Sequence, residues 1–215
     1  MNWYHYFCLV SLGLCTGGCI YHATRLIRLG KVKDFSPPRG KVPPAVMYSF
    51  TGAMHPAKKE SAFLHLPTYT AGILYHAGTF LSFLLLFLLL HGTALPAGLR
   101  YACFLILLVS AFSGAAILLK RFSKKGLRDL SSPDDDMSNL LVTIFQGMTA
   151  LALIFDHILP FYYILTGILL LYIPIGKLKH TIYFFAARYH LGFFFGWRGV
   201  WPPTQINPGK DGAIN

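Results

Sequence analysis

Charged side chains are scarce in this chain of 215 residues: Asp, Glu, Lys and Arg together make up 13% of it. Soluble globular domains carry about 25% charged residues. Hydrophobic residues reach 54%, and the mean hydropathy is +0.52. This composition excludes a soluble enzyme and a disordered protein, and it indicates a polytopic membrane protein.

The sequence also lacks the short motifs of several function classes. It contains no glycine-rich phosphate loop, no Cys-x-x-Cys pair and no nucleophile elbow. We interpret its four cysteines as small packing residues rather than disulfide or cluster ligands: Cys8, Cys15, Cys19 and Cys103. We find no internal repeat of the kind that a small transporter would show.

Five apolar segments follow one another along the chain, at residues 3–23, 66–90, 99–119, 139–155 and 158–175. A helix needs about 20 residues to cross the hydrocarbon layer. Asp156 and Pro160 argue against fusing the last two segments into one helix. The N-terminus lacks the basic region of a cleavable signal, so the first segment is expected to remain as an anchor. The sequence therefore predicts an all-α integral membrane protein with five transmembrane helices.

The basic residues predict the orientation of these helices. Of the 19 Lys and Arg residues, only Arg100 lies outside the loops after the first and third segments and the C-terminal region. The positive-inside rule places the N-terminus outside and the C-terminus in the cytoplasm. We expect a membrane domain over residues 1–190, with an inner loop at about 28–65 for partner docking, and a cytoplasmic aromatic and basic tail over 191–215. The net charge of +11 favours anionic lipid or an acidic partner, not nucleic acid.

Two of the nine histidines are candidate cofactor ligands because of their position in the apolar segments. An ionisable side chain inside a bilayer is a functional candidate because it is costly to place there. His76 lies within the second apolar segment, and His180 lies at the inner end of the fifth. Two neutral imidazoles from facing helices can bind a haem iron from both sides, and the small residues Ala77 and Gly78 would let a flat macrocycle approach the backbone. The alternative from spacing alone is a hydrogen-bonded core histidine.

A set of local patterns resembles one family of membrane proteins. The patterns are Leu74-Tyr75-His76-Ala77-Gly78, Leu118-Leu119-Lys120-Arg121, Asp136 followed by Gln146, and Pro174-x-x-Lys177-Leu178-x-His180. With five helices, they resemble the membrane cytochrome b (gamma) subunit of respiratory nitrate reductase. The resemblance extends to the membrane subunits of heterodisulfide-reductase-like and Dsr-type complexes, and it covers roughly residues 1–190.

The resemblance implies a multi-pass protein of the prokaryotic inner membrane. It also implies that His76 and His180 bind the iron of an inner b haem. The positions of the two outer haem ligands are Leu86 and Tyr162 here, which implies one haem rather than two. The implied function is electron transfer between the quinone pool, menaquinone or ubiquinone, and a cytoplasmic iron–sulfur subunit. That partner would be nitrate-reductase-beta-like or heterodisulfide-reductase-like, and it would carry the terminal oxidoreductase chemistry.

Other arrangements remain open from the residues. A second haem could pair His65 with His190, since His65 and His76 are 11 residues apart and would share one face of a helix. Pro67 would interrupt such a helix. The candidates for a quinone site in the inner half are His65, Lys58 and Lys59. A different class of function is a haem-free membrane anchor or assembly subunit that tethers a cytoplasmic redox partner.

Overall fold

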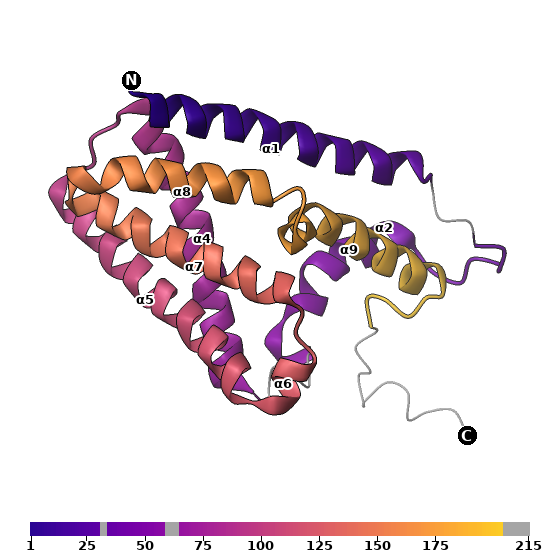
Figure 1. The fold of residues 1–215 in the computed structure, drawn as a ribbon. Coiled ribbons are helices and arrows are strands. Elements are labelled where there is room, and N and C mark those ends of the chain that lie inside the picture. The colour runs from indigo at the N-terminus through magenta and orange to yellow at the C-terminus, as the bar shows by residue number, and fades with distance from the viewer. Residues whose placement is uncertain (31–33, 59–64, 204–215) are drawn as a thin grey trace. The chain divides into compact units, whose positions relative to one another are not determined.

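The computed structural model describes residues 1–30, 34–58 and 65–203, and this part of the chain is helical with no strand. It divides into two compact units. The bundle unit comprises residues 1–22 and 65–180. The α2–α9 unit comprises residues 23–64 and 181–215. Figure 1 shows the path of the chain through the helices of both units.

The bundle unit contains the helices that are long and apolar enough to cross a membrane. Its helices are α1 (Trp3–Arg28, which continues beyond the unit), α4 (Leu66–His91), α5 (Ala97–Ser123), α6 (Lys125–Asp129), α7 (Pro133–Ile154) and α8 (Leu159–Tyr172). Among the described residues, the length and composition of 4 helices suit a span, or 5 if the interrupted pair Asp156–Tyr172 and Lys177–Trp197 forms one span. The length and composition of the helices therefore support the expectation of a multi-pass membrane protein.

The fourth predicted segment begins earlier than its hydropathy indicated, at Pro133 instead of residue 139. Ser132 caps the helix, because its Oγ accepts from the Asp135 backbone N–H while the Asp135 carboxylate accepts from the Ser132 N–H. Three aspartates occupy the first turn, where the positive end of the helix dipole stabilises them. Charged residues lower the mean hydropathy of a segment. The predicted segment therefore omitted about the first one and a half turns of this 22-residue helix.

Pro67 begins α4 rather than interrupting it. The helix starts at Leu66, with Pro67 in the first turn, where a missing N–H costs nothing. His65 precedes the helix and has φ −130° and ψ 43°. His65 therefore does not share a helix face with His76, because it lies outside the helix. At the other end, Gly92 terminates the helix at φ 75°, a conformation that glycine adopts without strain.

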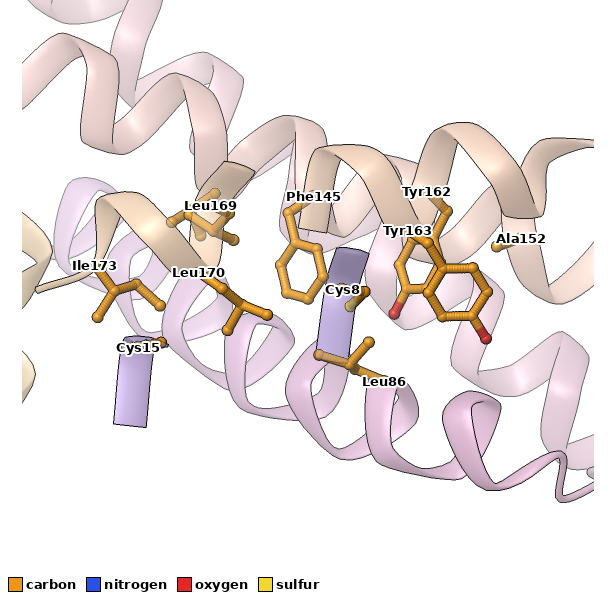
Figure 2. Close-up of a cluster of buried hydrophobic side chains, with 11 residues drawn as sticks. Cys8, Cys15, Leu86, Phe145, Ala152, Tyr162, Tyr163, Leu169, Leu170 and Ile173 are labelled. Carbon is orange, nitrogen blue, oxygen red and sulfur yellow. The ribbon is translucent and has the colours of Figure 1, made fainter. Parts of the chain in front are cut away.

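The core of the bundle unit is centred on α7, which is the most buried of the spanning helices. One cluster joins Cys8 and Cys15 of α1 to Phe145 of α7 and Leu170 of α8 (Figure 2). A second cluster joins α7 to α4 and α5 and includes Cys103. The buried cysteines are free thiols in apolar packing, as the sequence analysis expected.

Glycines let α5 approach its neighbours closely. A Cβ added at Gly114 would collide with the Tyr75 ring and with Thr143 Oγ1, and one at Gly78 would collide with Ser110. These contacts join α4, α5 and α7, which Figure 1 draws side by side. Because an interior of this density has no free volume, side chains at these positions would separate the helices.

The α2–α9 unit pairs α2 (Val42–Phe50) with α9 (His180–Trp197). Two short 3-10 helices follow α2, at Gly52–Met54 and Pro56–Lys58. Gly192 and Gly196 of α9 lie against Val46 and Ala45 of α2. The expected inner loop is thus packed against the C-terminal region, and α9 runs unbroken through residue 190, where we expected a tail to begin.

Polar contacts join the C-terminal end of α9 to the segment before α2. The Trp197 indole N–H donates to the Ser36 carbonyl at 2.7 Å, and Arg198 pairs with Asp34 at 2.8 Å. Hydrogen bonds from Ser36 and the charge of Arg198 hold the pKa of the Asp34 carboxyl below its usual range. Asp34 is therefore ionised at neutral pH, which maintains its pairing with Arg198.

We predict that Gly114→Val lowers the thermal stability of the detergent-solubilised protein. The added methyl groups must displace the Tyr75 ring, and overpacking of this kind costs about 1–3 kcal/mol. The midpoint is measured by size-exclusion chromatography after heating. Gly147→Ala is the matched control, because a Cβ there meets no atom within 4 Å. Equal midpoints for the two variants would contradict the close helix packing.

A second prediction concerns the end of α9. Asp34→Asn removes the charge that pairs with Arg198 but keeps a hydrogen-bond acceptor for Ser36. We expect trypsin at pH 8 to cleave after Arg198 a few-fold faster in this variant, since surface ion pairs have small energies. Cleavage after Lys125, outside this unit, is the internal reference. An unchanged ratio of the two cleavage rates would contradict the role of the pair.

Candidate histidine site

His76 lies in the middle of α4 and its side chain is exposed on the helix surface. Its Nδ1 is 2.8 Å from the Gly72 carbonyl oxygen, one turn earlier. A carbonyl oxygen only accepts hydrogen bonds, so Nδ1 must carry the proton. Nε2 of the neutral ring is then unprotonated and directed away from this bond. This is the tautomer that a metal ion requires of an Nε2 ligand.

His180 repeats this arrangement on a different helix. It is the first residue of α9, directly after the 3-10 turn Lys177–Lys179, and its side chain is exposed. Its Nδ1 is 3.0 Å from the Lys177 carbonyl oxygen. The same reasoning assigns the proton to Nδ1 and leaves Nε2 as a lone-pair donor.

Two other histidines with described ring hydrogen bonds differ in this respect. His5 Nδ1 accepts a hydrogen bond from the backbone N–H of Asn2 at 3.1 Å, so its Nε2 carries the proton. His22 uses Nε2 itself, at 2.9 Å from the Pro174 carbonyl oxygen. Among these four histidines, only the two predicted haem ligands use Nδ1 for a hydrogen bond to a carbonyl and leave Nε2 out of that hydrogen bond.

The surface beside His76 is open on the side of Gly72. A Cβ at Gly72 would meet no atom within 4 Å, and Ala77 is exposed. The expectation for Gly78 was wrong, because Gly78 is buried and faces Ser110 of α5. Gly72 and Ala77 are therefore the small residues on the open surface near His76, while Gly78 serves helix packing.

A buried polar network holds the opposite face of α4. The Gln146 side chain of α7 is fully buried, and its Nε2 donates to the Tyr75 carbonyl at 2.9 Å and to Thr79 Oγ1 at 2.7 Å. Its Oε1 accepts from Ser110 Oγ of α5 at 2.7 Å. The Tyr75 hydroxyl donates to the Asn139 carbonyl at 2.9 Å. The network fixes the rotation of α4, which directs His76 away from the bundle interior.

Sequence reasoning named Gln146 only within the resemblance and missed this positioning role. The sequence does contain a signal for this role, in the periodic spacing of its polar residues. Polar residues recur at helical spacing on two segments: Asn139, Thr143 and Gln146 on α7, and Tyr75, Thr79 and Ser82 on α4. In apolar helices, polar stripes of this period indicate interhelical hydrogen bonds.

The two positions that the resemblance assigns to outer haem ligands lie in the core. Leu86 and Tyr162 are both 0% exposed and belong to one apolar cluster (Figure 2). The Phe145 ring stacks on Tyr162 with centroids 6.1 Å apart and also contacts Phe83. A macrocycle between these positions would have to displace Phe145.

The remaining candidates are distributed over both units. His65 lies in the bundle unit and His190 in the α2–α9 unit, so their pairing as a second haem site stays a prediction. Both side chains are exposed. Lys58 is exposed in the α2–α9 unit, whereas Lys59 lies outside the described residues. A quinone site formed by these three candidates stays a prediction.

The two imidazoles of the principal pair do not contact each other. The described ring contact of His76 is with Tyr75, at 6.1 Å between centroids. No group of three or more His, Cys, Asp or Glu side chains among the described residues could hold a metal ion. Comparison of the chain with protein-family models, with curated proteins and with solved structures finds no match.

The hydrogen-bond network around Gln146 generates a stability prediction. Gln146→Leu removes the amide bonds to Tyr75, Thr79 and Ser110, and each interhelical hydrogen bond in a membrane contributes about 0.6 kcal/mol on average. We expect a loss of about 2 kcal/mol, measured by reversible denaturation in mixed micelles. Met148→Leu, a volume-conserving change on the same helix, is the control. A loss no larger than that of the control would contradict the network's role.

Proposed function

We propose that this chain is a membrane cytochrome b that transfers electrons between the quinone pool and a cytoplasmic iron–sulfur protein. His76 and His180 are the proposed axial ligands of one b haem. The observation that carries the proposal is the shared hydrogen-bond pattern of these two rings. In both, Nδ1 donates to a backbone carbonyl and Nε2 remains available as a ligand.

The residues fit a group that needs two protein donors. A porphyrin provides four nitrogen ligands itself, so the protein has to supply only the axial pair. The hydrogen bonds that His76 Nδ1 donates to the Gly72 carbonyl and His180 Nδ1 donates to the Lys177 carbonyl would orient each ring and raise the basicity of its Nε2. The open surface at Gly72 and Ala77 would admit a planar group beside the ring.

Bound haem would supply the one-electron chemistry. The chain's own residues position the ligands for it. Gln146 ties α4 to α5 and α7 and so holds His76 on the outward face. His180 follows the 3-10 turn at the start of α9, where Lys177 and Lys179 mark the inner end under the positive-inside orientation.

The packed core at Leu86 and Tyr162 supports one haem rather than two. With a single inner haem, quinone would have to react in the inner half of the membrane, because a site at the outer face would be too distant. His65 and Lys58 are the described candidates on that side, and each is exposed. The terminal chemistry would belong to the iron–sulfur partner.

The test is a dithionite-reduced-minus-oxidised spectrum with haem quantified per polypeptide. We expect one b haem in the wild-type protein and its loss in His76→Ala and in His180→Ala. His5→Ala should retain the haem, because its Nδ1 accepts a hydrogen bond and its Nε2 carries the proton. Size-exclusion profiles establish that all variants are folded.

Full haem content in either ligand variant would contradict the assignment of that residue. Two haems per chain, with one retained in the His76 variant, would favour the additional pair His65 and His190. A folded wild-type protein without haem, purified with its partner, would overturn the cytochrome proposal and favour the haem-free anchor.

A further inference from the structure

A cavity of about 540 Å³ lies in the bundle unit, where α4 begins, α5 ends and α7 begins. Its lining includes five basic side chains and a single carboxylate: His65, Lys120, Arg121, Lys124, Lys177 and Asp135. Lys120, Arg121 and Lys124 are neighbours in the sequence, and the fold brings His65, Asp135 and Lys177 to them. We propose that this cavity binds the phosphate group of an anionic phospholipid.

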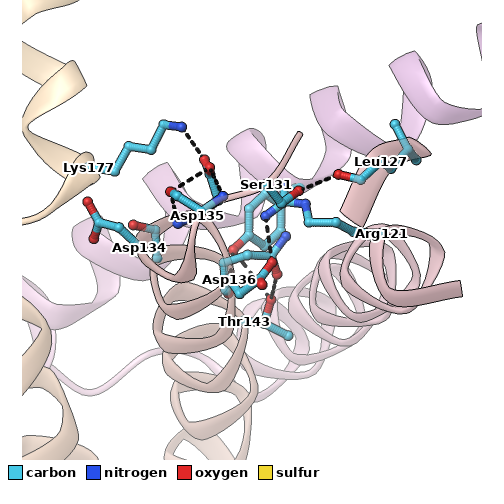
Figure 3. Close-up of polar contacts among 12 residues, drawn as sticks. Arg121, Leu127, Ser131, Asp134, Asp135, Asp136, Thr143 and Lys177 are labelled. Carbon is cyan, nitrogen blue, oxygen red and sulfur yellow. Dashed lines mark hydrogen bonds and ion pairs between the residues drawn. The ribbon is translucent and has the colours of Figure 1, made fainter. Parts of the chain in front are cut away.

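The cations in the cavity exceed the carboxylates that neutralise them. Arg121 pairs with Asp136 at 3.1 Å, and Lys177 pairs with Asp135 (Figure 3). The Lys120 ammonium donates to the neutral Thr68 hydroxyl. The Lys124 ammonium has no hydrogen-bond or ion-pair partner within the part of the chain that the structure describes. Two positive charges therefore remain without a counter-ion, and a phosphate diester group can supply the negative charge.

The lining is also apolar in part, which favours lipid over a soluble anion. Ile117, Leu127 and Leu130 line the same cavity as the cations. The Leu130 side chain is 86% exposed. A free phosphate ion would gain nothing from these surfaces, whereas acyl chains or the glycerol backbone of a lipid would cover them.

The position of the cavity along the helices agrees with this ligand. It extends from Ile117, inside the apolar part of α5, to Lys124 just beyond the helix end at Ser123. Lipid headgroups occupy this transition from apolar to charged residues. Basic pockets between transmembrane helices on the cytoplasmic side are of the kind that bind anionic lipid headgroups.

The test uses two neighbouring lysines. Lys124 lines the cavity and Lys125 does not, so Lys124→Gln and Lys125→Gln change the net charge equally. The full-length protein is reconstituted in nanodiscs containing phosphatidylglycerol and phosphatidylcholine, and retained lipids are counted by native mass spectrometry after detergent transfer. We expect selective retention of phosphatidylglycerol by the wild-type protein, about five-fold weaker in Lys124→Gln and unchanged in Lys125→Gln.

Competition with inorganic phosphate separates the two sources of the anion. Displacement of the lipid at millimolar phosphate would support a site that recognises the phosphate group alone. Retention of the lipid at that concentration would support a contribution of the acyl chains as well. Equal losses in the two variants would overturn the proposal, as would equal retention of the two lipids. Weaker association with a protein partner in Lys124→Gln, with lipid retention unchanged, would assign the cavity to an acidic protein segment and overturn it too.

Discussion

The arrangement of the bundle unit depends on the Gln146 side chain. Its amide joins α7 to the Tyr75 carbonyl and Thr79 of α4 and to Ser110 of α5. In helices that cross a membrane no water can satisfy a buried amide, so an unpaired Gln146 would be costly. The partners it requires exist in one rotational setting of α4 relative to α5 and α7. The close approach of Gly78 to Ser110 is compatible with that same setting.

The rotation of α4 determines what its outer face presents. With Tyr75, Gly78 and Ser82 directed at neighbouring helices, the 100° step per residue places His76 on the exposed side. An imidazole in a membrane helix has two polar nitrogens to satisfy. The Gly72 carbonyl accepts from Nδ1, and Nε2 has no partner on its own helix. The interior network and the outward-facing His76 imidazole are therefore two consequences of one helix orientation.

The sequence predicted the first four apolar helices because apolar composition over about 20 residues is a property of each segment by itself. The fifth predicted segment forms α8, whose 14 residues suit a span only together with the bent continuation Lys177–Trp197. The sequence predicted less well what depends on local caps or on other helices. The start of α7 could have been found from Ser132 and Asp135, which form a capping box, but hydropathy alone rejects the aspartates. Gly78 could not have been assigned, since its role depends on Ser110, 32 residues away. The packing of α2 on α9 likewise has no local signal.

The distribution of charge links the orientation of the chain to its chemistry. Three aspartates of the described part pair with basic residues: Asp34 with Arg198, Asp135 with Lys177, and Asp136 with Arg121. With only eight acidic residues in the whole chain, most Lys and Arg side chains have no carboxylate to pair with.

A cation that serves topology alone can lie anywhere along an inner loop. Lys120 and Lys124 instead converge with Arg121 and Lys177 on one cavity. Because like charges repel, cations gathered at one place favour the binding of an anion there. The convergence therefore agrees with the proposal that part of the basic surplus has an anionic ligand, in addition to the role in membrane orientation that the positive-inside rule predicts.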